Sequence, residues 1–315
     1  IGLAAIDNGM ISFGSFFISL SIFSGFFYLP MKFSHYKIQF PWRQIKVFGS
    51  IFLLLFILMY IFSNIAANYK YRTNILLYQR AVEKLEASSS HVRITSLGIL
   101  KNAAVELPAY RKSILHTIAA FIKDKIRQNN YSEEVKYAVD CLVNISKLEN
   151  DISSNLQFNS LSLQGFDFSN ANFAGVDFSG SDLSNAKFAS TNLQGASFQD
   201  CKIDYVDFSW AKMNDVDFRK CSGIKINMTN AIIHQSNLRF AKMIESRFAH
   251  AQISSSEVTK AVFSSSNFNY STLVDIDFRY TDLSGSTFLH TELEDVRFKK
   301  DDQKLLGLHY LNHNH

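Results

Sequence analysis

Few side chains in this sequence have the type and spacing that chemistry requires. Cys201 and Cys221 form a pair that could bind a metal or cycle between thiol and disulfide. Two small buried residues are the alternative for this pair. His309, His313 and His315 could bind a metal, or they could form a frayed polar tail at the C-terminus. We expect no metal site, because the spacing of these residues is not that of a ligand set.

Motifs of enzyme chemistry are missing from the sequence. It has no nucleophile elbow, phosphate-binding loop or glycine-rich dinucleotide turn. Carboxylates such as Asp177 and Asp182 recur at the spacing of a repeat and are not gathered as a catalytic pocket requires. Three cysteines without framework spacing also argue against a disulfide-built secreted domain. The sequence therefore predicts a protein that is not an enzyme and has no cofactor.

A five-residue repeat organises residues 156–300. Every fifth position from Phe158 to Phe298 carries an apolar side chain, with Gly223 as the exception. Of these 29 positions, 14 are Phe and 7 are Leu, and a small residue such as Ser181 comes two positions earlier. A period of five fits neither an α-helix nor a flat strand, and such an internal repeat predicts a solenoid.

Four consecutive repeats can close one four-sided turn. The apolar residue and the small residue then point inward, and the positions between them face solvent. Turns that stack about 4.8 Å apart through parallel β-type hydrogen bonds would use the 29 repeats in slightly more than seven turns. This geometry makes Cys201 and Cys221 inward-facing neighbours, one turn apart. Ile224 and Ile226, next to Gly223, predict a local bulge that refills the gap left by the glycine.

These repeats resemble the pentapeptide-repeat family, whose pattern is Ala-Asp/Asn-Leu/Phe-X-X. Matching segments are Ala171–Gly175, Ser181–Asn185 and Ala186–Ser190. The resemblance implies a right-handed quadrilateral parallel β-helix with varied, mostly non-enzymatic roles. The segment from Tyr78 to Leu100 is similar to the helical module that precedes the repeats in membrane-anchored bacterial members of the family. That arrangement implies a solenoid on the cytoplasmic side of the membrane.

Two uncharged apolar runs come before the helical region, at residues 10–29 and 47–67. Each is long enough to cross a bilayer as a transmembrane α-helix, and buried core helices or a signal peptide are the alternatives. Lys and Arg number four in the loop between the runs and four after the second, so the charge rule does not choose an orientation. We expect a multi-pass anchor in the bacterial inner (cytoplasmic) membrane that contacts the lipid bilayer through both runs.

Residues 70–152 predict a small α-helical bundle like one or two HEAT-type units. Its helices are expected at Tyr71–Ala87, Val92–Leu107 and Arg111–Gln128, and from Ser132 onward, with serines as N-caps. Bulky residues at the inward small position, Leu156, Leu161 and Phe166, indicate where the last helix docks on the solenoid. The predicted domains are a two-helix transmembrane hairpin (1–69), a helical neck and cap (70–152), the β-helix (153–300), and a C-terminal cap and tail (301–315) that includes a helix at Asp301–Leu311.

Outward side chains one turn apart should stack in columns on the solenoid. One column alternates basic and aromatic residues, a second carries three arginines, and a third contains Trp210 and Tyr270 beside histidines. Asp217 and Asp277 should pair with the arginines two positions later, so a mutually neutralised, solvated face is the alternative to a binding surface. The predicted partner-binding residues are Arg219, Lys220, Arg239, Phe240, Lys260, Arg279, Tyr280, Trp210 and Tyr270.

The charge balance separates the candidate functions. Residues 1–155 hold 17 Lys and Arg against 10 Asp and Glu, whereas residues 156–300 hold 14 against 16, a net charge of −2. The pattern favours a non-enzymatic membrane-anchored scaffold or adaptor whose rod binds protein subunits of a membrane complex. The alternative is a DNA mimic that binds topoisomerase, as in family members that shield DNA gyrase, but those are strongly acidic. A transporter accessory is disfavoured because neither apolar run contains a charged residue. Nucleic acid is not an expected partner.

Overall fold

The computed structural model describes residues 42–149 and 156–302, and for residues 42–48 it describes the backbone alone. The predicted span at residues 10–29, nearly all of the expected helix Asp301–Leu311, and the three C-terminal histidines lie outside these ranges. The chain divides into two units, Ile1–Arg72 and Thr73–His315, which are described separately.

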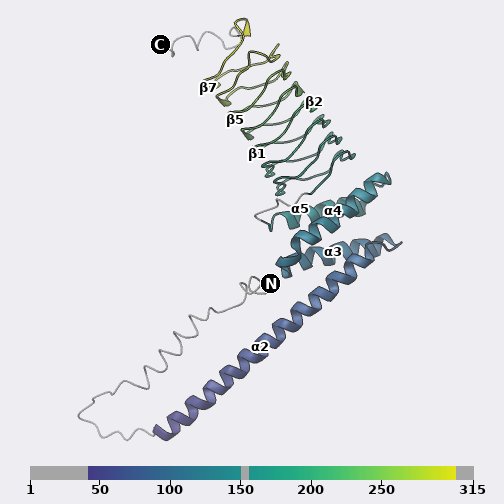
Figure 1. Ribbon diagram of the computed structural model, residues 1–315, viewed down its shortest axis with the longest axis vertical. Coiled ribbons are helices and arrows are strands. Elements are labelled where there is room, and N and C mark those ends of the chain that lie inside the picture. Colours follow the sequence, from purple (N-terminus) through teal and green to yellow (C-terminus); the bar gives the residue numbers. More distant parts are fainter. Residues whose placement is uncertain (1–41, 150–155, 303–315) are drawn as a thin grey trace, which may run out of the picture. The chain divides into compact units, whose positions relative to one another are not determined.

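Helix α2 (Trp42–Lys84) contains the second apolar run. Figure 1 shows it as one unbroken helix, and its segment Gly49–Lys84 is long and apolar enough to cross a membrane. Side chains such as Leu55 and Phe62 are exposed, so this apolar surface has no cover within the described residues. A single helix of this kind, by length and composition, fits an anchor or a signal segment.

Three helices follow, α3 (Ser90–Glu106), α4 (Arg111–Arg127) and α5 (Glu133–Ser146), with a 3₁₀ turn at Pro108–Tyr110. Their bounds lie within about two residues of the sequence prediction. Helix α5 packs against both α3 and α4, and buries Val139 and Leu142. Their assignment to a HEAT-type unit stays a prediction.

The serine caps were expected to bond to the helix backbone, and that expectation is wrong. Ser89 and Ser132 occupy the N-cap positions of α3 and α5, but neither side chain makes a capping hydrogen bond. The neighbouring Ser90 hydroxyl instead donates to Glu134 Oε2 at 2.8 Å, which ties α3 to α5. The hydroxyl therefore serves a contact between helices and not a helix terminus.

The solenoid completes one turn every four repeats. Parallel bridges join the residue before each inward apolar side chain to its equivalent one turn later, from Gln157 with Asp177 to Asp277 with Arg297, with a gap between Glu257 and Asp277. Where the pairing is longest it forms short strands, stacked as Figure 1 shows: β1 (Lys212–Asn214), β2 (Ser222–Ile224), β3 (Ile232–His234), β4 (Lys242–Ile244), β5 (Gln252–Ser254), β6 (Thr272–Val274) and β7 (Glu292–Glu294). One sheet has the order β1-β3-β5-β6-β7, and β2 pairs with β4. The sequence prediction of a parallel β-solenoid is confirmed.

Phenylalanine rings fill the inside of the solenoid. Phe198 is fully buried, with its ring centroid 5.2 Å from that of Phe178 and 5.1 Å from that of Phe218, both nearly parallel. It also meets Phe188 and Phe208 edge to face. Each buried ring contributes about 1.5–3 kcal/mol of hydrophobic stabilisation, and the ring pairs add to it. Because side chains fill the interior, only the outer walls of the solenoid are accessible to other molecules.

Gly223 corrects the sequence prediction of a bulge. It lies in β2 in direct register with Met243 of β4, so no residue is inserted into the ladder. A Cβ atom at this position would lie 2.5 Å from the carbonyl oxygen of Ile203, because the backbone at Gly223 approaches the preceding turn. Ile224 faces solvent and does not refill a gap, whereas Ile226 is buried at the ordinary small position. Close approach of the backbone explains the missing side chain.

Helix α5 and the residues after it dock on the first turn, as the sequence predicts. Asn172 donates its backbone N–H to Ser146 Oγ at 3.0 Å and its side-chain amide to the carbonyl oxygen of Glu149 at 2.6 Å. The bulky residues Leu156, Leu161 and Phe166 are all buried. The helices therefore cover one end of the solenoid, which would otherwise expose apolar side chains and unpaired strand edges.

Candidate functional site

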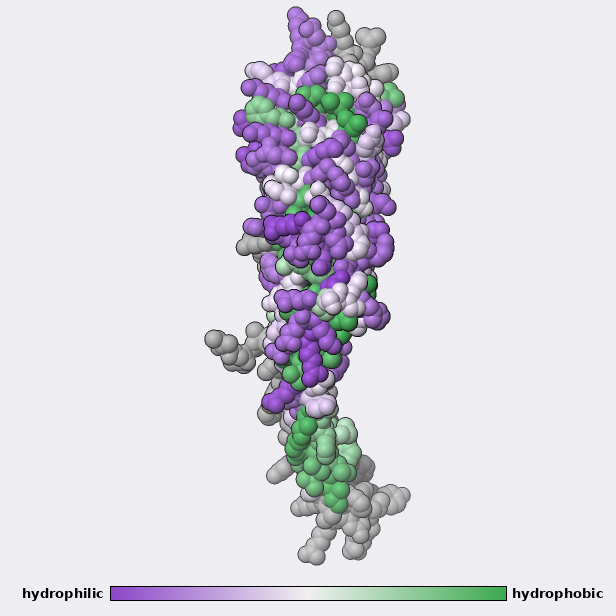
Figure 2. Space-filling view, turned by 90° about the vertical axis from the view of Figure 1, so that its right-hand side faces the viewer, coloured by the Kyte–Doolittle hydropathy of each residue, from purple (hydrophilic) through white to green (hydrophobic). Residues whose placement is uncertain are grey.

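The corners of the solenoid impose a backbone conformation that restricts side chains. From Ser160 to Asp295, every fifth residue except Tyr280 turns the chain with a positive φ, and at several corners this residue is glycine, as at Gly165 and Gly195. Most other residues pay about 1–2 kcal/mol for this left-handed conformation. Figure 2 shows the resulting wall, mostly hydrophilic with small apolar areas.

Besides a column with Tyr205 (φ +57°) and Lys225 (φ +54°), two columns of corner residues carry rings or long cations despite this cost. In one, φ is +58° at Lys220 and +60° at both Phe240 and Lys260; in the other, it is +61° at Trp210 and Tyr270. We call the first surface the basic corner (Arg219, Lys220, Arg239, Phe240, Lys260, Arg279 and Tyr280). We call the second the ring corner (Trp210, Asn230, His250, Tyr270 and His290). Bulky side chains in strained positions point to a functional role more than to stability.

The two ends of the basic corner are neutralised by their own acids. Arg219 Nη2 lies 2.6 Å from Asp217 Oδ2, and Arg279 Nη2 lies 2.6 Å from Asp277 Oδ2, as expected from the spacing. The hydrogen bond from Arg279 lowers the pKa of Asp277. Burial alone would raise the pKa of Asp217, but the hydrogen bonds from Arg219 outweigh it and lower the pKa. Both carboxylates therefore stay charged at neutral pH.

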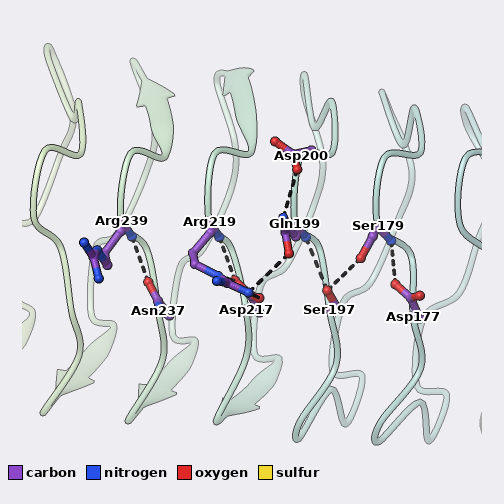
Figure 3. Close-up of polar contacts among 9 residues, drawn as sticks. All are labelled: Asp177, Ser179, Ser197, Gln199, Asp200, Asp217, Arg219, Asn237 and Arg239. Carbon is purple, nitrogen blue, oxygen red and sulfur yellow. Dashed lines mark hydrogen bonds and ion pairs between the residues drawn. The ribbon is translucent and has the colours of Figure 1, made fainter.

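The middle of the basic corner is less neutralised. The ladder puts Asn237 where the previous turn has Asp217, so Arg239 lacks an acid of its own turn. Figure 3 shows the Arg219 side chain turned toward Asp217, while the Arg239 side chain points away from Asn237. The nearest acid to Arg239 is Glu257, with 3.4 Å between Nε and Oε1.

Phe240 lies between two cations at this corner. The guanidinium carbon of Arg239 is 5.8 Å from its ring centroid, and the Lys260 ammonium is 5.3 Å away. Phe240 is 39% exposed. In the part of the chain that the structure describes, the Lys220 and Lys260 ammoniums have no ion-pair partner. This centre combines exposed positive charge with exposed aromatic surface, which suits an acidic and partly apolar partner.

The ring corner is a separate surface. Tyr270 is stacked between His250 and His290, with 5.1 Å between ring centroids on each side. Trp210 is 62% exposed, and Asn230 separates it from the stack. The two columns lie two corners apart in a turn of four corners, hence on opposite corners. The structure therefore does not bring the nine predicted residues together: seven form the basic corner, and Trp210 and Tyr270 belong to the ring corner.

The two solenoid cysteines are inward-facing neighbours, as the spacing predicts. Cys201 Sγ lies 2.9 Å from the carbonyl oxygen of Phe178. Burial raises the pKa of Cys201 to about 12 and raises the pKa of Cys221 well above its usual value. Both thiols are free and protonated at neutral pH. These properties fit two small buried residues, and among the described residues no cluster of three or more His, Cys, Asp or Glu could hold a metal.

The helical bundle contains a buried ion pair that the sequence did not predict. Glu134 is 2% exposed, and its Oε2 lies 2.7 Å from Arg93 Nη2. The Arg93 guanidinium also donates to the carbonyl oxygens of Ala87 and Ser88, just beyond the end of α2. Glu134 shares a helical face with the buried Ala138 and Cys141, and that spacing is the signal that could have placed it inside.

An open cleft of about 570 Å³ lies between α5 and the first solenoid turn. Val139, Val143 and Phe166 contribute apolar lining, and Lys136 and Asp167 contribute opposite charges. No group with the geometry of a catalytic pair is found among the described residues of this lining.

Comparisons with known proteins agree with the repeat. A model of a pentapeptide repeat region matches residues 171–241, and a model of pentapeptide repeats in eight copies matches residues 261–299. No curated protein matches the sequence.

Three solved structures are similar to parts of this chain, and two of them, AT2G44920 and HetL, are pentapeptide-repeat proteins. AT2G44920, from the Arabidopsis thaliana thylakoid lumen, is 30% identical over 34% of this chain and 68% of its own, with a TM-score of 0.20. HetL, involved in heterocyst differentiation regulation in the cyanobacterium Nostoc sp. strain PCC 7120, is 13% identical over 45% of this chain and 88% of its own, with a TM-score of 0.23. Full-length QnrB1, a plasmid-mediated fluoroquinolone resistance protein, is 17% identical over 46% of this chain and 94% of its own, with a TM-score of 0.19. From the two family models, together with the parallel ladder, residues 171–241 and 261–299 of this chain belong to the pentapeptide-repeat family.

Proposed function

We propose that this protein is a non-enzymatic, membrane-anchored scaffold or adaptor whose pentapeptide-repeat rod binds protein subunits of a membrane complex. The observation that carries the proposal is the centre of the basic corner. There Arg239 and Lys260 lie against the exposed ring of Phe240, and Arg239 pairs with Glu257 of the next turn at 3.4 Å. Arginine and aromatic residues are enriched at protein interfaces.

Rigidity of the rod supports the same function. Backbone hydrogen bonds such as Lys220 N–H to Arg239 O, 3.0 Å, and Phe240 N–H to Thr259 O, 3.1 Å, fix the corner to the next turn. A partner that binds here does not have to order the backbone, so little conformational entropy is lost on binding.

The proposed location is the bacterial inner (cytoplasmic) membrane, with a multi-pass anchor and the solenoid on the cytoplasmic side. Helix α2 supports an anchor because its apolar side chains are exposed over a length that crosses a bilayer. Free cysteines at positions 141, 201 and 221 suit a reducing compartment.

A topoisomerase-binding DNA mimic is the competing function. Such a protein imitates the phosphate charge of duplex DNA, whereas the solenoid has a net charge of only −2 from 14 basic and 16 acidic residues. The exposed centre of the basic corner has the opposite sign to DNA. Charge therefore favours the scaffold.

Affinity capture of the full-length protein in mild detergent tests the proposal. We expect stoichiometric membrane-complex subunits with the unmodified protein, and several-fold lower capture with Arg239→Glu or Phe240→Asn. Lys212→Glu is the matched control, because it changes the charge at an exposed position on a wall that does not border the basic corner. Capture of topoisomerase in place of membrane subunits would support the DNA mimic. Absence of any partner, or equal loss with the control, would overturn the scaffold function.

A further inference from the structure

The basic corner alternates charge and ring from one turn to the next. Its column reads Lys220, Phe240, Lys260, Tyr280, and all four side chains are exposed. Parallel stacking places Lys220, Phe240 and Lys260 about 4.8 Å apart, so one complete alternation spans about 9.6 Å. The step to Tyr280 is irregular, because the Lys260 N–H donates to the carbonyl oxygen of Tyr280 itself, whereas the Phe240 N–H donates to that of Thr259. The column thus has a period along the rod axis that a partner could match.

An α-helix laid along the rod has nearly the same period. It rises 1.5 Å per residue, so positions i, i+3, i+7 and i+10 on one face lie at about 0, 4.5, 10.5 and 15 Å. The corner presents cation, ring and cation at about 0, 4.8 and 9.6 Å, and Tyr280 follows after the irregular step. The mismatch stays below about 1 Å over the first three positions.

Other ligand geometries fit less well. An extended strand presents side chains on one face every 6.6–6.8 Å or so, and is out of step by about 2 Å at the second position. A nucleic acid or an anionic lipid surface favours uninterrupted positive charge. Here Phe240 and Tyr280 interrupt the lysines, and Asp217 and Asp277 already neutralise Arg219 and Arg279.

We propose that the basic corner binds an amphipathic helix of the partner protein, parallel to the solenoid axis, with acidic residues at i and i+7 and apolar residues at i+3 and i+10; this names the partner chemistry of the proposed scaffold function and rests on it. The acids meet Lys220 and Lys260, and the apolar residues contact Phe240 and Tyr280. Arg239, whose nearest acid is at 3.4 Å, adds charge beside the helix.

The turn before Lys220 fixes where the helix can start. Asp200 occupies the same column one turn earlier and is exposed. An acidic residue of the partner at that point would face a like charge, which penalises a helix shifted by one turn. The alternation therefore selects one register as well as one partner class.

The left-handed backbone at Phe240 suggests a substitution that tests this surface without disturbing the fold. Phe240 has a φ of +60°, a conformation that asparagine adopts at little cost. Phe240→Asn therefore removes the ring without disturbing the turn. Lys220→Glu combined with Lys260→Glu reverses the two cations, and Lys212→Glu on another wall controls for a charge reversal at an exposed lysine.

The test uses the full chain in nonionic detergent and a fluorescent helical peptide of about 21 residues. The peptide carries Glu at i and i+7 and Leu at i+3 and i+10 on an alanine and glutamine background. A second peptide has the same composition, with the four residues moved to different faces of the helix. Fluorescence anisotropy should show binding of the in-phase peptide at least about tenfold tighter than the permuted one. Phe240→Asn and the double lysine variant should each lose about tenfold, and Lys212→Glu should not.

Equal affinity for the two peptides would overturn the helix geometry. Binding of phosphatidylglycerol vesicles or duplex DNA, with the same dependence on Lys220 and Lys260 and without peptide binding, would also overturn it. If partner capture still depends on Arg239 and Phe240 while neither peptide binds, the helix geometry is wrong and the scaffold function stands. If nothing is captured, the scaffold function itself fails.

Discussion

At the level of single residues, some corners hold bulky side chains in a backbone conformation that lowers stability. Glycine or asparagine would satisfy the left-handed turn at every corner, yet Trp210 has a φ of +61° and Phe240 a φ of +60°. Neither ring belongs to the buried core, and both are substantially exposed. Proteins tolerate such a local cost where a side chain serves function, so we expect these two rings to have a role other than stabilising the fold.

Trp210→Asn should therefore stabilise the protein. Asparagine removes a left-handed cost of about 1 kcal/mol, and an exposed indole loses little packing. Urea unfolding followed by circular dichroism should show a free energy of unfolding higher by about that amount. Trp210→Ala is the control, because alanine lacks the ring but keeps the strain. A gain with alanine equal to that with asparagine would show that removal of the ring, and not relief of the backbone, is responsible.

The buried pair of Arg93 and Glu134 should make stability depend on pH. Burial alone would raise the pKa of Glu134, but hydrogen bonds from Ser90 and Arg93 outweigh it and lower the pKa from the ordinary value of 4.5. Because the folded pKa lies below the unfolded one, this stabilisation is fully present above pH 4.5 and is lost as pH falls through the folded pKa. Thermal unfolding between neutral and acidic pH measures it.

Glu134→Gln should cost about 3–5 kcal/mol at neutral pH, because it leaves the buried Arg93 without a counter-charge. It should also flatten the loss of stability below pH 4.5. Glu133→Gln is the matched control, since the side chain of Glu133 is exposed and pairs with Lys136 at the surface. If both variants show the same pH profile, the buried pair is not the source of the acid sensitivity.

At the level of elements, the stacked interior and the close backbone contacts hold the solenoid together. Phe198→Ala should lower the free energy of unfolding by about 3–5 kcal/mol, because it opens a cavity between Phe178 and Phe218 in the packed interior of the solenoid. Chemical denaturation measures the cost, and Leu289→Ala, at an exposed wall position, is a control expected to stay near wild type. A cost below about 1 kcal/mol for Phe198→Ala would contradict a tightly filled interior.

Gly223→Ala tests the close approach of two turns. The added Cβ would lie 2.5 Å from the Ile203 carbonyl oxygen, so one strand must shift, at a cost of about 1–3 kcal/mol. The variant should also lower amide hydrogen-exchange protection across β2 and β4. Val262→Ala, a small change on an outer wall of the solenoid, should leave both strands protected. Unchanged protection in Gly223→Ala would favour a bulge at this site.

The sequence predicts regular parts of these elements better than single exceptions. Every fifth residue from Phe158 to Phe288 is buried, and only Leu293 and Phe298 at the end are partly buried, so one repeat predicts nearly all of these positions. The bulge predicted at Gly223 is wrong because spacing alone does not reveal how closely two backbones approach. Glu134 escapes prediction because its partner Arg93 is far away in the sequence. The columns follow from the repeat period, but the repeat period does not show that Asn237 replaces the acid that Asp217 supplies one turn earlier, so that Arg239 pairs with Glu257 of the next turn.

At the level of the whole molecule, the proposed function assigns anchoring to an apolar helix and binding to the solenoid. Helix α2 exposes apolar residues over a length that crosses a bilayer, and the solenoid keeps its interior closed. Almost every inward side chain packs in the interior, so a partner can contact only the outer walls of the solenoid. The basic corner has two exposed cations beside an exposed ring, whereas the corner with Tyr205 and Lys225 has one.

Site-specific photo-crosslinking in cells tests this account most directly. A photoreactive amino acid replaces Phe240 in one variant and Lys212 in another, both at exposed positions of the same rod. We predict a discrete crosslinked membrane-protein partner from position 240 and none from position 212. Crosslinks of equal yield at both positions, or a partner that attaches only through position 212, would contradict a binding function of the basic corner.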